Sequence, residues 1–361
     1  MIFKKFKQLY PQERYQTADL LKGFAILMMI QVHLIELFAK PEINQSLLGK
    51  IFLFLGGPPA APLFMAVMGY FLAVSKKSFS QNLKRSLILI LGGILLNIGL
   101  NFHFLILIFI GKVQANPFRY IFGADILPLA GLSIILISII KKISSNSFYT
   151  TSIISLLILI FILIFHSISV DHRTNNQILV YVQAFLWGNI EWSYFPLFPW
   201  AVYPLVGFLY RIILEQFNLG EDIGDFFALL SAAITFSAFT YGIDAASDLR
   251  NYYHHNWLYT LWIFQFLILL TFSLDKLENF CGKNSFLIYV KWLGKNVTSV
   301  YVFQWLLIGN IATAIFQTQN EFALAVWFLV ITIITSILAY SYETLSKIRK
   351  RDIDQQQLSR N

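Results

Sequence analysis

Hydrophobic runs of about 20 residues recur along the whole chain, with only short polar stretches between them. A run of this length forms a helix that can cross the hydrocarbon core of a bilayer, which is about 30 Å thick. The pattern predicts an all-α fold, a polytopic membrane protein with about ten transmembrane helices. The predicted spans cover residues 18–39, 51–75, 86–110, 121–140, 150–170, 194–214, 226–244, 256–274, 297–317 and 322–344.

Three stretches do not fit this regular pattern. Residues 171–193 hold an apolar run that is short and interrupted at Gly188. We expect a re-entrant or interfacial piece there, because an extra crossing would invert every later basic loop. Residues 284–296, NSFLIYVKWLGKN, mix apolar residues with cations and predict an amphipathic helix on the cytoplasmic surface. The tail RDIDQQQLSRN is expected to be disordered.

The positive charges gather in alternate loops, which predicts the orientation of the chain. Cytoplasmic loops of membrane proteins carry an excess of Lys and Arg, so the basic side and both termini are expected to be cytoplasmic. We divide the chain into a basic N-terminal segment (1–17), a transmembrane domain (18–345) and a cytoplasmic tail (346–361). The cations on this side are Lys4, Lys5, Lys7, Arg14, Lys76, Lys77, Lys84, Arg85, Lys141, Lys142, Arg211, Lys276, Lys283, Lys291, Lys295, Lys347, Arg349, Lys350 and Arg351.

Composition supports the same class of protein. Hydrophobic residues make up 57% of the chain and charged residues 13%, and the mean hydropathy is +0.65. These values exclude an ordinary soluble domain and indicate a multi-pass protein of the cytoplasmic membrane. The net charge of +8 follows from the basic loops and does not indicate nucleic acid binding. Because Cys281 is the single cysteine, an internal disulfide framework is excluded.

The first span, DLLKGFAILMMIQVHLIELF, carries four ionisable side chains. Lys22 and His33 are 11 residues apart, which is about 1100° of helix rotation, so they project from nearly the same face about 16 Å apart. Asp19 and Glu36 lie at i,i+3 spacing from Lys22 and His33, where side chains can meet. Ionisable groups inside a membrane are costly and indicate a functional site. A structural alternative is an interfacial Asp19–Lys22 ion pair with Glu36 in the headgroup region.

His33 is the strongest candidate for chemistry, because an imidazole gains and loses a proton near neutral pH. No metal is expected, since His254 and His255 are adjacent and no clear third ligand accompanies them. On the third span, Asn97 and Asn101 share a helix face and are expected to form hydrogen bonds between helices.

Four stretches together resemble the membrane-bound acyltransferases, a group that includes the acyltransferase-3 and heparan-α-glucosaminide N-acetyltransferase-like families. DLLKGFA, with a His 11 residues after the basic residue, resembles their opening helix, and GGPPAAPLFMAVMGYFLA resembles their second span. YFPLFPWAVYPLVGFLY and LGKNVTSVYVFQWLL resemble two later segments of the heparan-type branch. Two residues depart from the pattern: Lys22 stands where many relatives have Arg, and Gln304 where the late helix often has His.

The resemblance implies that a cytoplasmic acyl-CoA, commonly acetyl-CoA, donates an acyl group to a hydroxyl or amine of a carbohydrate or envelope acceptor. His33, Asp19 and Glu36 are then the predicted catalytic residues, and Lys22 and Asn296 the predicted CoA-binding residues. Tyr301, Gln304 and Tyr70 are the predicted substrate-binding residues. Asn296, Tyr301 and Gln304 are also candidate hydrogen-bond donors to the oxyanion, and Tyr301 and Gln304 share a helix face.

Two mechanisms are open at this point. His33 acts as a general base in a ternary complex, or as a nucleophile that forms a transient acyl-imidazole. The expected partners are acyl-CoA, the acceptor and the lipid bilayer, without nucleic acid, and a homodimer is left open. The alternative function is a multi-span transporter or lipid-handling protein that uses the same polar residues as a proton or substrate path. The absence of an evident internal repeat disfavours it.

Overall fold

A computed structural model describes residues 16–145, 147–219, 224–281 and 284–358, with side chains through residue 349. Within these ranges every regular element is a helix, and two isolated β-bridges are the only extended pairings. The predicted all-α class is therefore confirmed. Residues 1–15 of the predicted N-terminal segment lie outside the described residues.

Nine helical segments among the described residues are long and apolar enough to cross a membrane, and a bent pair makes a tenth. Uninterrupted spans are α2 (Gln16–Phe38), α6 (Phe79–Leu100), α9 (Ile126–Ile143), α10 (Phe148–Ser169), α17 (Trp257–Cys281), α19 (Val297–Ile315) and α20 (Glu321–Leu358). Two spans are built from consecutive helices, α4 (Leu47–Gly56) with α5 (Ala61–Val74), and α12 (Leu197–Trp200) with α13 (Val202–Phe217). The bent pair is α14 (Asp225–Ser237) and α15 (Phe239–Ser247), which meet at 65°.

Each of the ten predicted spans corresponds to one of these segments, with shifts at the ends. The third starts seven residues earlier than predicted, at Phe79 instead of 86, because Ser78 and Gln81 form a capping box before the basic turn. It ends at Leu100, and the remaining apolar residues form the separate helix α7 (Phe102–Phe109). At the break, the Asn101 side chain donates to the backbone oxygens of Asn97 and Tyr120.

Short helices fill the connections between the spans. They are α3 (Pro41–Gln45), α8 (Pro117–Ile121), α11 (Leu179–Leu186), α16 (Leu249–Tyr253) and α18 (Ser285–Lys295). Within 171–193 the only helix is α11, which is too short to cross a bilayer, so the prediction of no additional span is confirmed. The helix predicted over residues 284–296 is present as α18.

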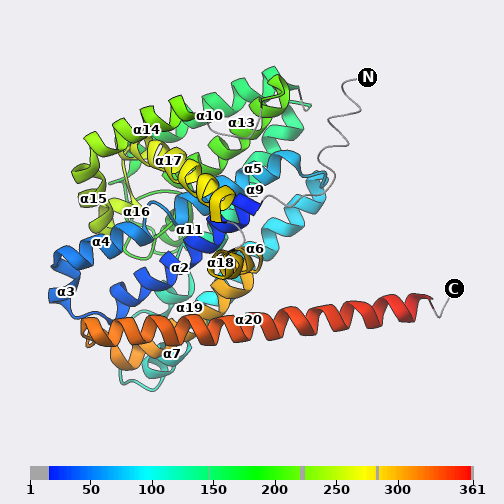
Figure 1. Ribbon diagram of the computed structural model, residues 1–361. Coiled ribbons are helices and arrows are strands. Elements are labelled where there is room, and N and C mark those ends of the chain that lie inside the picture. Colours follow the sequence, from blue (N-terminus) through cyan, green and yellow to red (C-terminus); the bar gives the residue numbers. More distant parts are fainter. Residues whose placement is uncertain (1–15, 146, 220–223, 282–283, 359–361) are drawn as a thin grey trace.

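The expectation of a disordered tail is wrong for most of its length. Helix α20 continues through Leu358 and extends past the rest of the bundle (Figure 1). The physical reason is that the sequence from residue 321 to 358 contains neither Pro nor Gly, so no residue stops the helix. Residues 359–361 lie outside the described part of the chain.

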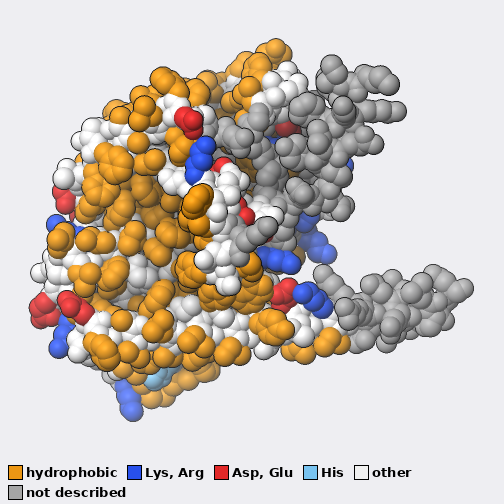
Figure 2. All heavy atoms as spheres, viewed as in Figure 1, with side chains coloured by type: hydrophobic (Ala, Val, Ile, Leu, Met, Phe, Trp, Pro, Cys, Tyr) orange, Lys and Arg blue, Asp and Glu red, His pale blue; other side chains and the backbone are white. Residues whose placement is uncertain are grey.

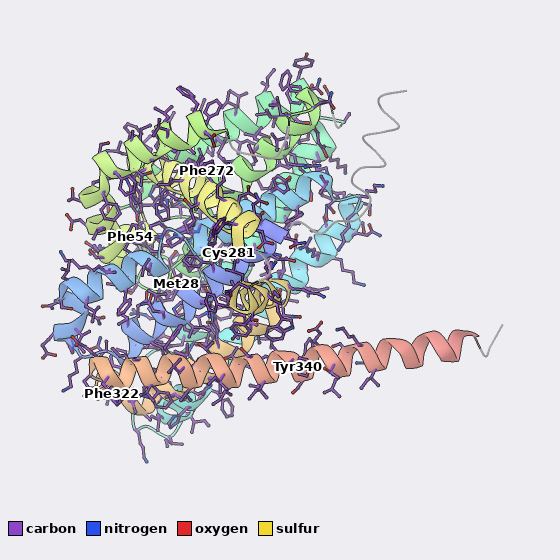
Figure 3. The ribbon with its side chains drawn as sticks, viewed as in Figure 1. Met28, Phe54, Phe272, Cys281, Phe322 and Tyr340 are labelled. Atoms are coloured by element: carbon purple, nitrogen blue, oxygen red, sulfur yellow. The ribbon has the colours of Figure 1, made fainter. Side chains whose placement is uncertain are left out.

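Helix α2 lies in the middle of the bundle and contacts α4, α5, α17, α18, α19 and α20 (Figure 1). Its residues Leu20, Ile26, Ile30 and Leu34 are almost completely buried. Aromatic rings hold the surrounding helices together: Phe54 of α4 (Figure 3) contacts the rings of Phe239, Trp262 and Phe266 in α15 and α17. Most of α2 is consequently enclosed by protein.

The outer surface of the bundle is apolar, as a bilayer requires. Hydrophobic side chains cover much of the face shown in Figure 2. Many large ones are exposed on α10 and α20, including Ile153, Phe161, Leu329 and Tyr340 (labelled in Figure 3). Because these side chains have no protein cover within the described chain, they are suited to contact with lipid.

Small residues allow the helices around α2 to approach closely. A Cβ atom added at Gly294 of α18 would collide with the backbone oxygen of Asp19, and one added at Gly23 would collide with that of Val290. Gly69 and Gly207 serve the contact of α5 with α13 in the same way. Glycine at helix crossings is typical of membrane proteins, where close backbone packing replaces the hydrophobic driving force.

We predict that Gly294→Ala destabilises the protein, because its methyl group has no room between α18 and α2. In detergent, the midpoint of thermal unfolding should fall by about 5 °C or more. Gly92→Ala is the matched control, since Gly92 is also helical but has open space where the methyl group would go. An unchanged midpoint for Gly294→Ala would contradict the close approach of the two helices.

Candidate active site

A cavity lies between α2, α4, α9, α16 and α19, and three of the predicted site residues line it: His33, Glu36 and Tyr301. We call it the His33 cavity. The other lining residues are Met29, Val32, Leu53, Gly56, Gly57, Ala61, Asp125, Ile126, Phe195, Ala246, Leu249, Tyr252, Tyr253 and Trp305. Apolar and aromatic side chains form most of the wall, and a few polar groups converge on the space, which is the usual composition of a small-molecule site.

His33 is held between a carboxylate and an indole ring. Its Nδ1 lies 3.6 Å from Glu36 Oε2, and its ring lies against that of Trp305, with 3.9 Å between the centroids and 36° between the planes. Both side chains of the ion pair are largely buried, at 12% and 15% exposure. At this distance Nδ1 makes no hydrogen bond within the described chain, and a small shift of the Glu36 carboxylate would form one and leave Nε2 for an incoming group. The carboxylate is thus placed to orient the imidazole once the two groups close to hydrogen-bond distance.

Asp125 and Tyr301 form a second polar pair in the wall of the cavity. Tyr301 Oη donates to Asp125 Oδ2 over 3.0 Å, and the backbone N–H of Ile126 donates to Oδ1 over 2.7 Å. Asp125 is buried and lies within electrostatic range of both His33 and Glu36. Sequence reasoning missed this residue, because an Asp before an apolar run is the usual signal of a helix N-cap.

The backbone around Asp125 is fixed by the segment that precedes α12. The N–H of Ala124 donates to Trp192 O, and Ala124 O accepts from Tyr194 and Phe195. This short extended pairing joins the start of α9 to the loop over the cavity. The carboxylate of Asp125 is consequently held in one place.

A chain of hydrogen bonds supports the aromatic wall of the cavity. Tyr252 Oη donates to Gly57 O at the break between α4 and α5. Burial lowers the pKa of His255 to about 3, so its imidazole is neutral. Its Nδ1 then donates to Tyr252 O over 2.8 Å, and Nε2 accepts from Tyr203 Oη over 2.7 Å. Burial also lowers the pKa of His254 to about 4.

The remaining predicted residues lie elsewhere. Asp19 and Lys22 form an ion pair of 2.7 Å near the start of α2, about 16 Å along the helix axis from His33. Asn296 Nδ2 donates to Glu343 Oε2 at the same end of the bundle. Tyr70 accepts a hydrogen bond from Arg211. None of these side chains is among those that line the His33 cavity.

Gln304 is completely buried, and both of its amide atoms lack a hydrogen-bond partner within the described chain. It precedes Trp305 but does not line the cavity. Across the same described residues, no three His, Cys, Asp or Glu side chains gather as a metal site requires.

Comparison with known proteins gives one match. A family model described as "Heparan-alpha-glucosaminide N-acetyltransferase, catalytic" matches residues 14–219, more than half of the chain. The matched region includes Asp19, Lys22, His33, Glu36 and Asp125. No curated protein and no solved structure matches the chain.

We predict that the folded protein loses stability as the pH falls below about 6.5, the ordinary histidine value. The unfolded chain then binds a proton at His255, whereas the folded chain binds it only near pH 3, so acid favours unfolding. The midpoint of thermal unfolding in detergent, measured from pH 7.5 to 5.0, should decrease.

The variant His255→Gln tests the source of this dependence. It should be less stable than the wild type at pH 7.5 and should show a smaller further decrease at pH 5.0. The control His172→Gln removes an exposed imidazole and should keep the wild-type pH dependence. Equal pH dependence in the wild type and His255→Gln would exclude His255 as a source.

Proposed function

The chain belongs to the heparan-alpha-glucosaminide N-acetyltransferase catalytic family, and we propose that it transfers an acetyl group from acetyl-CoA to a carbohydrate acceptor. The acceptor group is a hydroxyl or an amine. We place the enzyme in the cytoplasmic membrane, with acetyl-CoA entering from the cytoplasmic side and the acceptor at the His33 cavity. The basic loops support this orientation.

The observation that carries the proposal is the His33–Glu36 pair inside the cavity. A base for acyl transfer needs an imidazole with one free nitrogen, a group that fixes its orientation, and a space for the acceptor beside it. Glu36 lies 3.6 Å from Nδ1 and can orient it, the ring of Trp305 lies against the imidazole, and His33 lines the cavity. The surrounding apolar wall excludes bulk water, which favours transfer to the acceptor over hydrolysis.

Two chemical routes agree with this arrangement. In the first, His33 removes the proton of the acceptor, whose oxygen or nitrogen attacks the thioester carbonyl, and CoA leaves as the thiolate. In the second, His33 attacks the thioester, CoA leaves, and the acceptor then takes the acetyl group from the imidazole. Tyr301 was predicted to donate to the oxyanion, but its hydroxyl proton is directed at Asp125.

Lys22 and its surroundings support a role in binding CoA at the other end of α2. Lys22 Nζ lies 2.7 Å from Asp19 Oδ1 and 6.0 Å from the centroid of the Phe71 ring. A cation at the start of the helix attracts the phosphates of CoA. Lys22 does so as a single charge, without the two-pronged contact that Arg provides.

We predict that His33→Ala lowers acetyl transfer by about 100-fold or more, the usual effect of removing a general base or nucleophile. The assay measures CoA release and label transfer from radiolabelled acetyl-CoA to a panel of glycans by the purified protein. His103→Ala is the matched control, because His103 is exposed and lies outside the cavity. Equal turnover in His33→Ala and the wild type would refute the role of His33. His33-dependent flux in proteoliposomes without CoA consumption would favour a transporter.

We predict that Lys22→Gln raises the KM for acetyl-CoA by about 10-fold, because the positive charge that attracts the CoA phosphates is lost. The KM for the acceptor should stay the same. Lys22→Arg should retain most of the affinity, and Lys50→Gln, which removes a cation paired with Asp244, should have no effect. A KM for acetyl-CoA that is insensitive to Lys22→Gln would place the donor site elsewhere.

A further inference from the structure

We propose that Asp125 is a specificity-determining residue that selects acceptors without a negative charge near the reacting group. In this role its carboxylate accepts a hydrogen bond from an ammonium or hydroxyl group of the acceptor. The inference rests on the proposed function, since it concerns the acceptor of the same transfer. It assigns a task to a residue that the sequence pattern marks only as a helix cap.

The first support is the charge balance of the His33 cavity. Asp125 and Glu36 both line it, and the described lining residues include neither Lys nor Arg. Arg119 and Arg173, which are not among the lining residues, lie 3.3 and 3.7 Å from Glu191. A buried carboxylate without a cationic partner is costly, and a ligand that donates to it reduces that cost.

The second support is the unused bonding capacity of Asp125. Each carboxylate oxygen can accept two hydrogen bonds. Oδ1 receives one from the Ile126 N–H and Oδ2 one from Tyr301 Oη, so both retain a free acceptor position. The residue is only 8% exposed and it lines the cavity, so a ligand in the cavity can reach a carboxylate that bulk solvent barely contacts.

The third support is the fixed backbone of Asp125 in the cavity that His33 also lines. Ala124 is tied through its backbone to Trp192, Tyr194 and Phe195, and Asp125 follows it directly. His33 and Asp125 therefore approach the cavity from α2 and from the start of α9. An acceptor held by Asp125 presents a neighbouring group to His33, and a phosphate or carboxylate in that position is repelled by both acids.

The experiment compares three probes with the full-length protein in detergent: an amino sugar, a neutral hexose and a sugar phosphate. The wild type should transfer acetyl from radiolabelled acetyl-CoA to at least one of the first two with a kcat/KM about 10-fold or more above that for the sugar phosphate. Asp125→Asn should raise the KM for the preferred probe by about 10-fold or more, the effect of losing one charge-assisted hydrogen bond. The KM for acetyl-CoA should stay unchanged, and discrimination against the sugar phosphate should weaken.

Two further variants separate charge from packing. Asp125→Glu keeps the carboxylate and should keep the discrimination. Tyr301→Phe removes the hydroxyl that contacts Asp125 Oδ2 but leaves the Asp125 carboxylate in place. This variant should therefore also discriminate against the sugar phosphate. The inference is overturned if folded Asp125→Asn lowers kcat equally for every probe without changing the KM for the acceptor.

The wild type alone also tests the inference, even where Asp125→Asn does not fold. Efficient transfer to the sugar phosphate by the wild type overturns the role of Asp125 while the acetyltransferase activity stands. The absence of both CoA release and label transfer with every probe would refute the proposed function, and the role of Asp125 would fall with it.

Discussion

The cost of placing ionisable side chains in hydrocarbon governs the arrangement of the bundle around α2. A charged group near the centre of a span costs about 2.5–3.5 kcal/mol even by insertion measurements, so it has to face protein. Helix α2 carries four ionisable groups, two toward each end, and six other helices surround it. Glycines at 23 and 294 bring α18 against α2 near Asp19 and Lys22. The ring of Trp305 covers His33 in the same way farther along the helix.

The cavity depends on a second constraint, which is that irregular backbone at membrane depth must be supported by protein. Gly57 lies in the break between α4 and α5, so its carbonyl is outside the hydrogen-bond pattern of either helix. Tyr252 Oη donates a hydrogen bond to it. His255 then fixes Tyr252 through its backbone and is itself fixed by Tyr203. The same hydrogen bonds that satisfy the break thus position the aromatic wall beside His33.

Hydropathy was sufficient to predict the spans, because each is a local property of about 20 consecutive residues. The i,i+3 spacing on a helix also predicted that His33 and Glu36 lie close together, as they do on α2. The sequence could not predict that Asp125 lines the same cavity as His33, because this depends on where the start of α9 meets Tyr301 of α19 and on the backbone contacts of Ala124. Trp305 and Tyr252 were missed for the same reason: an aromatic residue in a membrane helix has no local pattern that separates a cavity wall from an ordinary core.

Buried side chains lie between Lys22 and His33 on α2, and the pattern of polar residues did not indicate that they separate the two residues. Both project from nearly the same face of α2, but Ile26 lies between them on that face and is 1% exposed. Met29, which is 6% exposed, closes the cavity on the side toward Lys22. A thioester bound with its phosphates at Lys22 therefore reaches His33 only if these side chains move. Methionine is flexible enough to change rotamer at small cost, so Met29 is the element of the wall best suited to admit the acetyl end. Within the proposed function, a few apolar side chains thus separate the Lys22 end of α2 from the His33 cavity, and this separation would keep water and the acceptor from the thioester until it reaches the imidazole.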